Sequence, residues 1–213
     1  MDAPDTKMLP AVASVTAIAT VAALLVTGSY ELSHDRIEVN RQRRLLESLH
    51  EVLDSASYDN DLAASRISVV DAELLGSTNP VDVFLARLEG EPVAAIFSSI
   101  APRGYSGPIN LLIGVSADAV VTGVRVTSHR ETPGLGDAID LQKSNWILGF
   151  DGTSLIAPEF SGWSVRADGG EFDSITGATV TPRAVVKSVR DTLIYFERNQ
   201  ETLFGNNSDT LDE

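Results

Sequence analysis

The sequence predicts an α+β protein, in which a single N-terminal transmembrane helix precedes a mostly antiparallel sheet with packed helices. Three observations predict this arrangement. An apolar stretch without charges covers residues 9–28. Runs rich in β-branched residues follow between residues 67 and 127, and turn residues separate them. An amphipathic pattern at helical spacing then extends from Pro182 to about Phe204.

The apolar stretch at residues 9–28 has the length of one helix crossing a lipid bilayer. A cleavable signal peptide is the alternative, but signal peptides have a shorter apolar region and a basic flank. Here the N-terminal flank is not basic, since it holds Asp2, Asp5 and only Lys7. We therefore predict a retained membrane anchor. Its small residues would let neighbouring helices pack closely, as expected beside other membrane proteins of a complex.

The charges that flank this anchor point to a cytoplasmic domain. Only Lys7 precedes the apolar stretch, whereas Arg36, Arg41, Arg43 and Arg44 follow it. The positive-inside rule would keep these arginines in the cytoplasm. The rule is weaker for long domains that are translocated, so the opposite orientation stays open.

The remaining boundaries follow from composition and periodicity. Residues 1–8 form an N-terminal tail, residues 29–61 a helical stalk with a polar linker, and residues 62–204 the folded domain. Within the stalk, apolar residues recur at three- and four-residue steps from Tyr30 to about Leu53. Residues 205–213 are predicted to be a disordered acidic tail.

The folded domain is predicted to begin with a meander of antiparallel strands. Short turn sequences separate the runs, which favours hairpins over crossovers. The predicted strands are Ile67–Leu75, Val81–Leu88, Pro92–Ile100, Ile109–Val115 and Ala119–Thr127.

Two further elements are predicted between the meander and the C-terminal helix. The pattern after Asp137 predicts a helix from Ala138 to about Phe150, with Asn145, Trp146 and Phe150 on its inner side. A short strand is expected at Trp163–Ala167.

Composition excludes several kinds of function. The net charge of −14 argues against nucleic acid as a partner. Without cysteine, the chain has no disulfide, no iron–sulfur ligation and no thiol catalysis. The three histidines, His34, His50 and His129, lack zinc-type spacing. We therefore predict no metal site and no catalytic residue set.

The stretch from Asp173 to Pro182 is the main candidate site. Thr176, Thr179 and Thr181 cluster there, with Thr181 predicted to cap a helix that begins at Pro182. The free amides and the positive dipole end of a helix N-terminus favour phosphate. The alternative is a capped turn that binds nothing.

The residues from Asp173 to Thr179 read DSITGAT and resemble the acceptor motif of proteins that carry FMN through a phosphoester bond to threonine. The resemblance implies that an ApbE-type flavin transferase splits FAD and joins the FMN phosphate to Thr179. Gly177 would let the transferase and the phosphate come close to the backbone. Asp173 would serve recognition by the transferase or cap the turn.

Two more stretches extend this resemblance in the same order along the chain. Gly104–Ile109 reads GYSGPI, and His129–Gly136 reads HRETPGLG. Together with the threonine motif they resemble the FMN-binding domain of the G subunit of the Rnf complex. The C subunit of the sodium-pumping NADH:quinone oxidoreductase shares the layout but is usually longer. NosR-type regulators share the threonine motif but carry further membrane helices and cysteine clusters.

This resemblance implies an electron-transfer subunit of a redox-driven ion pump that works between NADH and ferredoxin, without independent catalysis. It implies subunits A, B, C, D and E as partners, with D and the A/E pair nearest. It also implies a bacterial inner-membrane protein whose flavin domain lies on the periplasmic side. This orientation is opposite to the one that the arginines after the anchor predict. The alternative is a membrane-tethered scaffold or binding module without a covalent cofactor.

The resemblance also implies which residues bind the flavin. The two glycine-rich loops would wall the isoalloxazine, and Glu131 and Thr132 would hydrogen-bond its polar edge. The predicted cofactor-binding residues are Gly104, Tyr105, Glu131, Thr132, Gly134, Leu135, Gly136, Asp173, Ser174, Thr176, Gly177, Ala178, Thr179 and Thr181.

Overall fold

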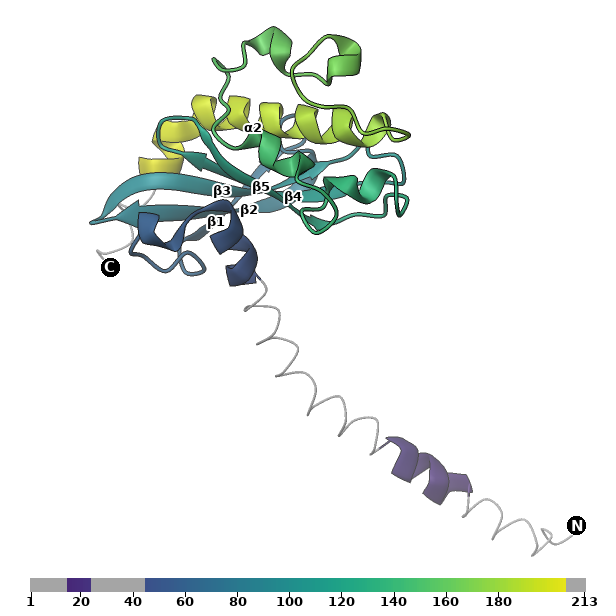
Figure 1. Ribbon diagram of the computed structural model, residues 1–213. Helices are drawn as coiled ribbons and strands as arrows, with labels where there is room; N and C mark the ends of the chain where they lie inside the picture. The colour runs from purple at the N-terminus through teal and green to yellow at the C-terminus, as the bar shows by residue number, and fades with distance from the viewer. Residues whose placement is uncertain (1–14, 24–44, 206–213) are drawn as a thin grey trace, which may run out of the picture. The chain divides into compact units, whose positions relative to one another are not determined.

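The computed structural model describes residues 15–23 and 45–205 (Figure 1). Tertiary contacts divide the chain into two units, Met1–Leu45 and Leu46–Glu213. In the first unit, residues 15–23 form a helix with exposed side chains. No helix among the described residues has the length and apolar character of a membrane span. Several predicted segments lie outside the described residues. These are the N-terminal tail 1–8, the rest of the predicted span 9–28, stalk residues 29–44 and C-terminal tail residues 206–213.

The second unit is built on a sheet whose strands follow one another in chain order, each antiparallel to the next (Figure 1). The predicted antiparallel meander is therefore confirmed. Its strands are β1 (Arg66–Asp71), β2 (Ser77–Leu88), β3 (Glu91–Ala101), β4 (Ile109–Ser116) and β5 (Val121–Ser128).

The first strand is shorter than predicted. It ends at Asp71, whose carboxylate accepts hydrogen bonds from the main-chain N–H groups of Glu73 and Leu74. Such local side chain–backbone bonds stabilise a turn in place of further strand pairing. The prediction that this strand reaches Leu75 was wrong for that reason.

The long helix α2 (Val180–Gly205) packs on one face of the sheet, against β3 and β4 (Figure 1). Phe97 of β3 meets Phe196 and Tyr195 of α2 edge to face, with ring centroids 6.2 and 6.0 Å apart. The helix begins two residues before Pro182, so Thr181 lies in its first turn. The prediction that Thr181 caps the helix was wrong, because its hydroxyl donates to the carboxylate of Glu131 instead.

A short helix that ends at residue 52 packs against β4 and β5 and precedes a one-turn 3-10 helix, η1 (Ser55–Ser57). Gly114 and Gly123 make room for it, since a Cβ at either position would come within 2.9 Å of Val52 main-chain atoms. The hydroxyl of Thr122 donates to the Val52 carbonyl at 2.7 Å. Further along, the Asn60 side chain accepts from the Arg87 N–H at 2.7 Å and so ties residues 54–61 to β2.

Residues 136–172 hold only short 3-10 turns, which are η2 (Gly136–Ile139), η3 (Trp146–Phe150), η4 (Phe160–Gly162) and η5 (Arg166–Asp168). The predicted helix from Ala138 to Phe150 was therefore wrong. Between η2 and η3, the Ser144 hydroxyl donates to the Ala138 carbonyl and accepts from the Trp146 N–H. These bonds compete with a regular helix.

Two smaller predictions about this region were also wrong. The expected strand Trp163–Ala167 is reduced to one bridge, between Val165 and Phe172. Asn145 is exposed rather than on an inner side, whereas Trp146 is half-buried and Phe150 is buried as expected.

An aromatic cluster holds these short turns together. Phe150 lies at its centre, with ring centroids 4.7 Å from Phe172, 5.4 Å from Trp146 and 6.4 Å from Trp163. The Trp146 indole N–H donates to the carbonyl of Asp173 at 2.7 Å. The cluster therefore anchors the start of the threonine stretch.

Candidate functional site

The threonine stretch forms a tight turn that leads directly into α2. The Ala178 N–H donates to the Ile175 carbonyl at 3.1 Å, and Gly177 has a φ of +79°. A β-turn with positive φ at its third position favours glycine there. Thr179 is exposed and is the last residue before α2, so it adjoins the first helical turn, whose N–H groups have no partner within the helix.

A pocket of about 310 Å³ opens at this turn. The two glycine-rich loops and the threonine stretch meet there, although they are far apart in the sequence. Val180 lines the pocket beside nine predicted residues, which are Tyr105, Glu131, Thr132, Leu135, Gly136, Gly177, Ala178, Thr179 and Thr181. The other predicted residues lie outside the lining: Gly104, Gly134, Asp173, Ser174 and Thr176.

Glu131 is the charged residue of this lining, and its side chain joins all three stretches. The residue is only 4% exposed. Its Oε1 accepts from the Ser106 N–H at 2.9 Å, and its Oε2 accepts from the Thr181 hydroxyl. Hydrogen bonds to an ionised acceptor are stronger than neutral ones, so Glu131 holds the two loops and α2 together.

Two of the predicted glycines make room for Glu131. A Cβ at Gly104 would lie 2.3 Å from the Gly107 carbonyl oxygen and 2.9 Å from Glu131 Oε1. A Cβ at Gly136 would lie 2.9 Å from the Glu131 Cβ. Both glycines were predicted to bind the cofactor. Gly136 lines the pocket and Gly104 does not, and both lie against the Glu131 side chain.

Asp173 and Ser174 shape the stretch from outside the pocket. The Asp173 carboxylate pairs with Arg166 at 2.7 Å on the exposed surface, and the Ser174 hydroxyl accepts from the Ala167 N–H at 3.3 Å. These contacts hold the chain just before the turn.

Asp168 and Arg183 form a further contact that sequence spacing did not reveal. The Arg183 guanidinium donates two hydrogen bonds to the Asp168 carboxylate, both at 2.6 Å. These bonds lower the pKa of Asp168, because they favour its ionised form. The pair ties the first turns of α2 to η5. No pattern in the sequence links two residues 15 positions apart in this way.

The lining has no cation, so an anion bound at Thr179 would depend on the amides and dipole of α2. Within residues 15–23 and 45–205, no group of three or more His, Cys, Asp or Glu side chains is placed to hold a metal ion.

Comparison with known proteins identifies the family. A family model described as the FMN-binding domain matches residues 104–194, which contain all three stretches of the pocket. The chain is also 47% identical over 180 residues to the G subunit of the ion-translocating oxidoreductase complex of Pseudoalteromonas atlantica, covering 84% of each chain. The chain belongs to the family of G subunits of ion-translocating oxidoreductase complexes. This confirms the resemblance drawn from the motifs.

Further G subunits of such complexes match over most of their length. Those of Aliivibrio fischeri and Vibrio cholerae are 44% and 43% identical over 185 residues, covering 87% of this chain and 88% of each relative. The family assignment therefore covers more of the chain than the FMN-binding domain alone.

Proposed function

We propose that this chain is an electron-transfer subunit of a membrane-bound, redox-driven ion pump, and that it carries FMN through a phosphoester bond to Thr179. One observation carries the proposal: Thr179 is exposed at a pocket inside the FMN-binding domain, directly before the N-terminus of α2. Free helical amides at that position stabilise a phosphate.

The attachment reaction balances with FAD as the donor. The Thr179 hydroxyl oxygen forms a bond to the phosphorus on the FMN side of the pyrophosphate, and the anhydride bond to the AMP half breaks. AMP leaves, and the hydroxyl proton passes to a base of the flavin transferase. An exposed hydroxyl suits this step, since the transferase must reach it from outside. The branched threonine side chain also restricts the direction of that hydroxyl.

The pocket walls fit a flat apolar ring with polar edges. Tyr105 is 72% exposed, Leu135 43% and Val180 40%. Apolar side chains exposed together at a pocket favour an apolar ligand that covers them. Thr132 and Glu131 then lie within the same lining to meet the polar edge of the ring. The flavin supplies electron transfer, while the chain supplies position and electrostatics.

The direct test is the intact mass of the chain after co-expression with a flavin transferase. We expect a gain of one FMN less water, about 438 Da. A mass equal to that of the unmodified polypeptide would leave a membrane-tethered scaffold as the remaining interpretation.

We expect Glu131→Gln to raise the reduction potential of the bound flavin, on the order of tens of millivolts. A negative carboxylate disfavours the negative charge that the flavin gains on reduction. The glutamine keeps the acceptor for Ser106, and the Thr181 hydroxyl can turn to accept from its amide. A redox titration followed by flavin absorbance measures the shift.

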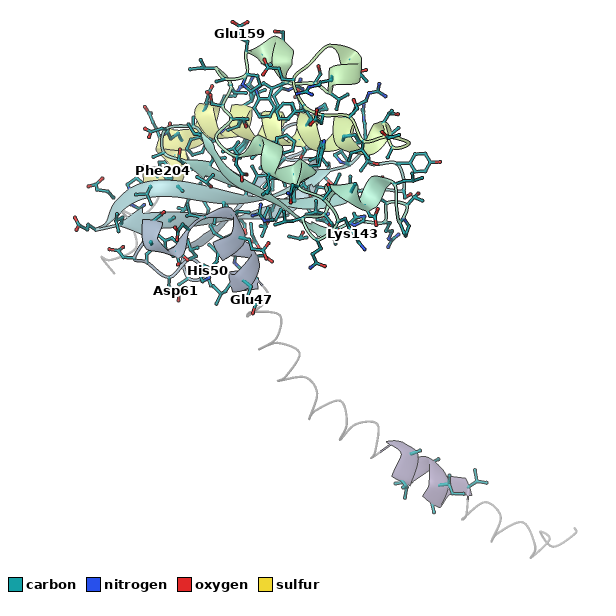
Figure 2. The ribbon with its side chains drawn as sticks, in the orientation of Figure 1. Glu47, His50, Asp61, Lys143, Glu159 and Phe204 are labelled. Carbon is teal, nitrogen blue, oxygen red and sulfur yellow. The ribbon has the colours of Figure 1, made fainter. Side chains whose placement is uncertain are left out.

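Glu159→Gln is the matched control for this charge removal. Glu159 is exposed and lies outside the pocket lining (Figure 2). Its replacement should leave the potential unchanged. A potential that stays the same or falls in Glu131→Gln would argue against the electrostatic role of Glu131.

We further propose that the complex is of the Rnf type, working between NADH and ferredoxin, with subunits A, B, C, D and E as partners. Membership in the family of G subunits supports this assignment. The D subunit and the A/E pair are the expected neighbours, and an ApbE-type transferase is the maturation partner. In this proposal residues 9–28 anchor the chain in the inner membrane, and the flavin domain lies on the periplasmic side.

The chain has no cysteine, so one introduced cysteine reports its topology without background. Glu159→Cys places a thiol on an exposed loop of the domain. We expect a membrane-impermeant maleimide to label it in intact spheroplasts. Labelling only after lysis would place the domain in the cytoplasm, in agreement with the arginines after the anchor.

A further inference from the structure

We propose that His129 is a positioning residue for the pocket and that it acts as the neutral ring with its proton on Nε2. This inference rests on the proposed function in one respect only. The pocket that His129 supports is the pocket proposed to hold flavin. The hydrogen bonds that carry it belong to the protein alone.

The side chain of His129 lies between two partners with fixed hydrogen-bonding roles. Its Nδ1 accepts from the main-chain N–H of Glu131 at 3.0 Å, and its Nε2 is 3.0 Å from Asp140 Oδ2. A backbone N–H can only donate, so Nδ1 carries no proton. An ionised carboxylate can only accept, so the single ring proton lies on Nε2.

The Glu131 main chain, in turn, sets the position of the carboxylate in the pocket. That carboxylate holds the Ser106 N–H and the Thr181 hydroxyl. The space around it is tight, since even a methyl group at Gly136 would lie 2.9 Å from the Glu131 Cβ. A displacement of the Glu131 main chain would therefore move both pocket loops relative to α2.

A second proton on His129 would break this arrangement. It would lie on Nδ1 and face the Glu131 N–H, so that two donors oppose each other. Protons can reach the ring, because His129 and Asp140 line a depression of about 380 Å³. The other charged groups there are Glu51 and Arg125, which pair at 3.2 Å.

Amide exchange on the full-length, flavin-free chain in detergent micelles tests the role of Nδ1. His129→Leu removes both ring contacts, whereas His129→Asn places an amide oxygen where Nδ1 accepts. We expect His129→Leu to lower the protection of the Glu131 amide about tenfold, and His129→Asn to keep it within about twofold of wild type. His50→Leu, at an exposed histidine on the helix that ends at residue 52, should change nothing (Figure 2).

The Ser106 amide separates a positioning role from simple packing, because it bonds to the Glu131 carboxylate and not to His129. His129→Leu should lower the protection of the Ser106 amide as well, whereas His129→Asn should keep it close to that of the wild type. Equal protection in wild type and His129→Leu would overturn the proposal. So would a ring-nitrogen NMR spectrum that places the proton on Nδ1 at neutral pH. Neither result would affect the mass test at Thr179, so failure of this inference and failure of the proposed function remain distinguishable.

Discussion

Thr179→Ala is expected to abolish covalent flavin attachment. The wild-type chain should gain about 438 Da when matured with a flavin transferase, whereas the variant should keep the mass of its polypeptide. The reason is chemical, because alanine has no oxygen to form the ester. Flavin fluorescence of the band in a denaturing gel reports the same loss, since only covalent flavin survives unfolding.

The neighbouring threonines provide matched controls for the acceptor assignment. Thr176 is exposed on the same turn, so Thr176→Ala removes a second accessible hydroxyl and should retain the full flavin mass. Thr179→Ser keeps a hydroxyl and should still accept FMN. Thr181 is buried against Glu131 and is out of reach of a transferase. Fluorescence that persists in Thr179→Ala would assign the ester to another residue. Loss of fluorescence in Thr176→Ala together with its retention in Thr179→Ala would assign the ester to Thr176.

Phe150→Ala is expected to destabilise the folded domain by about 3–5 kcal/mol, which corresponds to a fall in Tm of roughly 10 °C. Phe150 is 0% exposed and contacts three other aromatic rings at the centre of its cluster. Its removal leaves a cavity between the short turns, and the surrounding side chains close such a cavity only in part. Both tryptophans of the chain belong to this cluster, so their fluorescence follows denaturation directly.

Phe160→Ala is the control for the loss of an aromatic ring. Phe160 is 61% exposed, and its ring lies 5.3 Å from the Arg190 guanidinium. Its replacement should cost less than about 1 kcal/mol. We also expect Phe150→Ala to slow flavin attachment, because the cluster holds the Asp173 carbonyl through Trp146. Equal stability of the two variants would show that the cluster does not support the domain.

The sheet and the C-terminal helix were predictable because their signals are local. Each strand carries β-branched residues between turn sequences, and α2 carries an amphipathic pattern over 26 residues. Residues 136–172 were not predictable in this way. The spacing of apolar residues after Asp137 suits a helix, but Ile139, Ile147 and Phe150 join the core formed with the sheet and α2. Packing in that core and the two bonds of Ser144 outweigh the helical pattern.

The candidate site was likewise predictable only in part. Resemblance indicated Thr179 and both glycine-rich loops, and the folded chain brings these stretches to one pocket. The motifs did not predict the roles of the individual residues. Gly104 and Gly136 make room for Glu131, and Thr181 binds Glu131 rather than capping the helix. The bond between His129 and Asp140 has no counterpart in the motif pattern.

The sequence by itself determined the antiparallel meander and a long C-terminal helix with threonines at its N-terminal end. Both depend on backbone preferences and patterns within a few neighbouring residues. Only the tertiary structure decided that Glu131 meets Ser106, 25 residues away, and Thr181, 50 residues away. A buried carboxylate is stable only where donors converge on it, and that convergence arises when distant loops fold against the same helix.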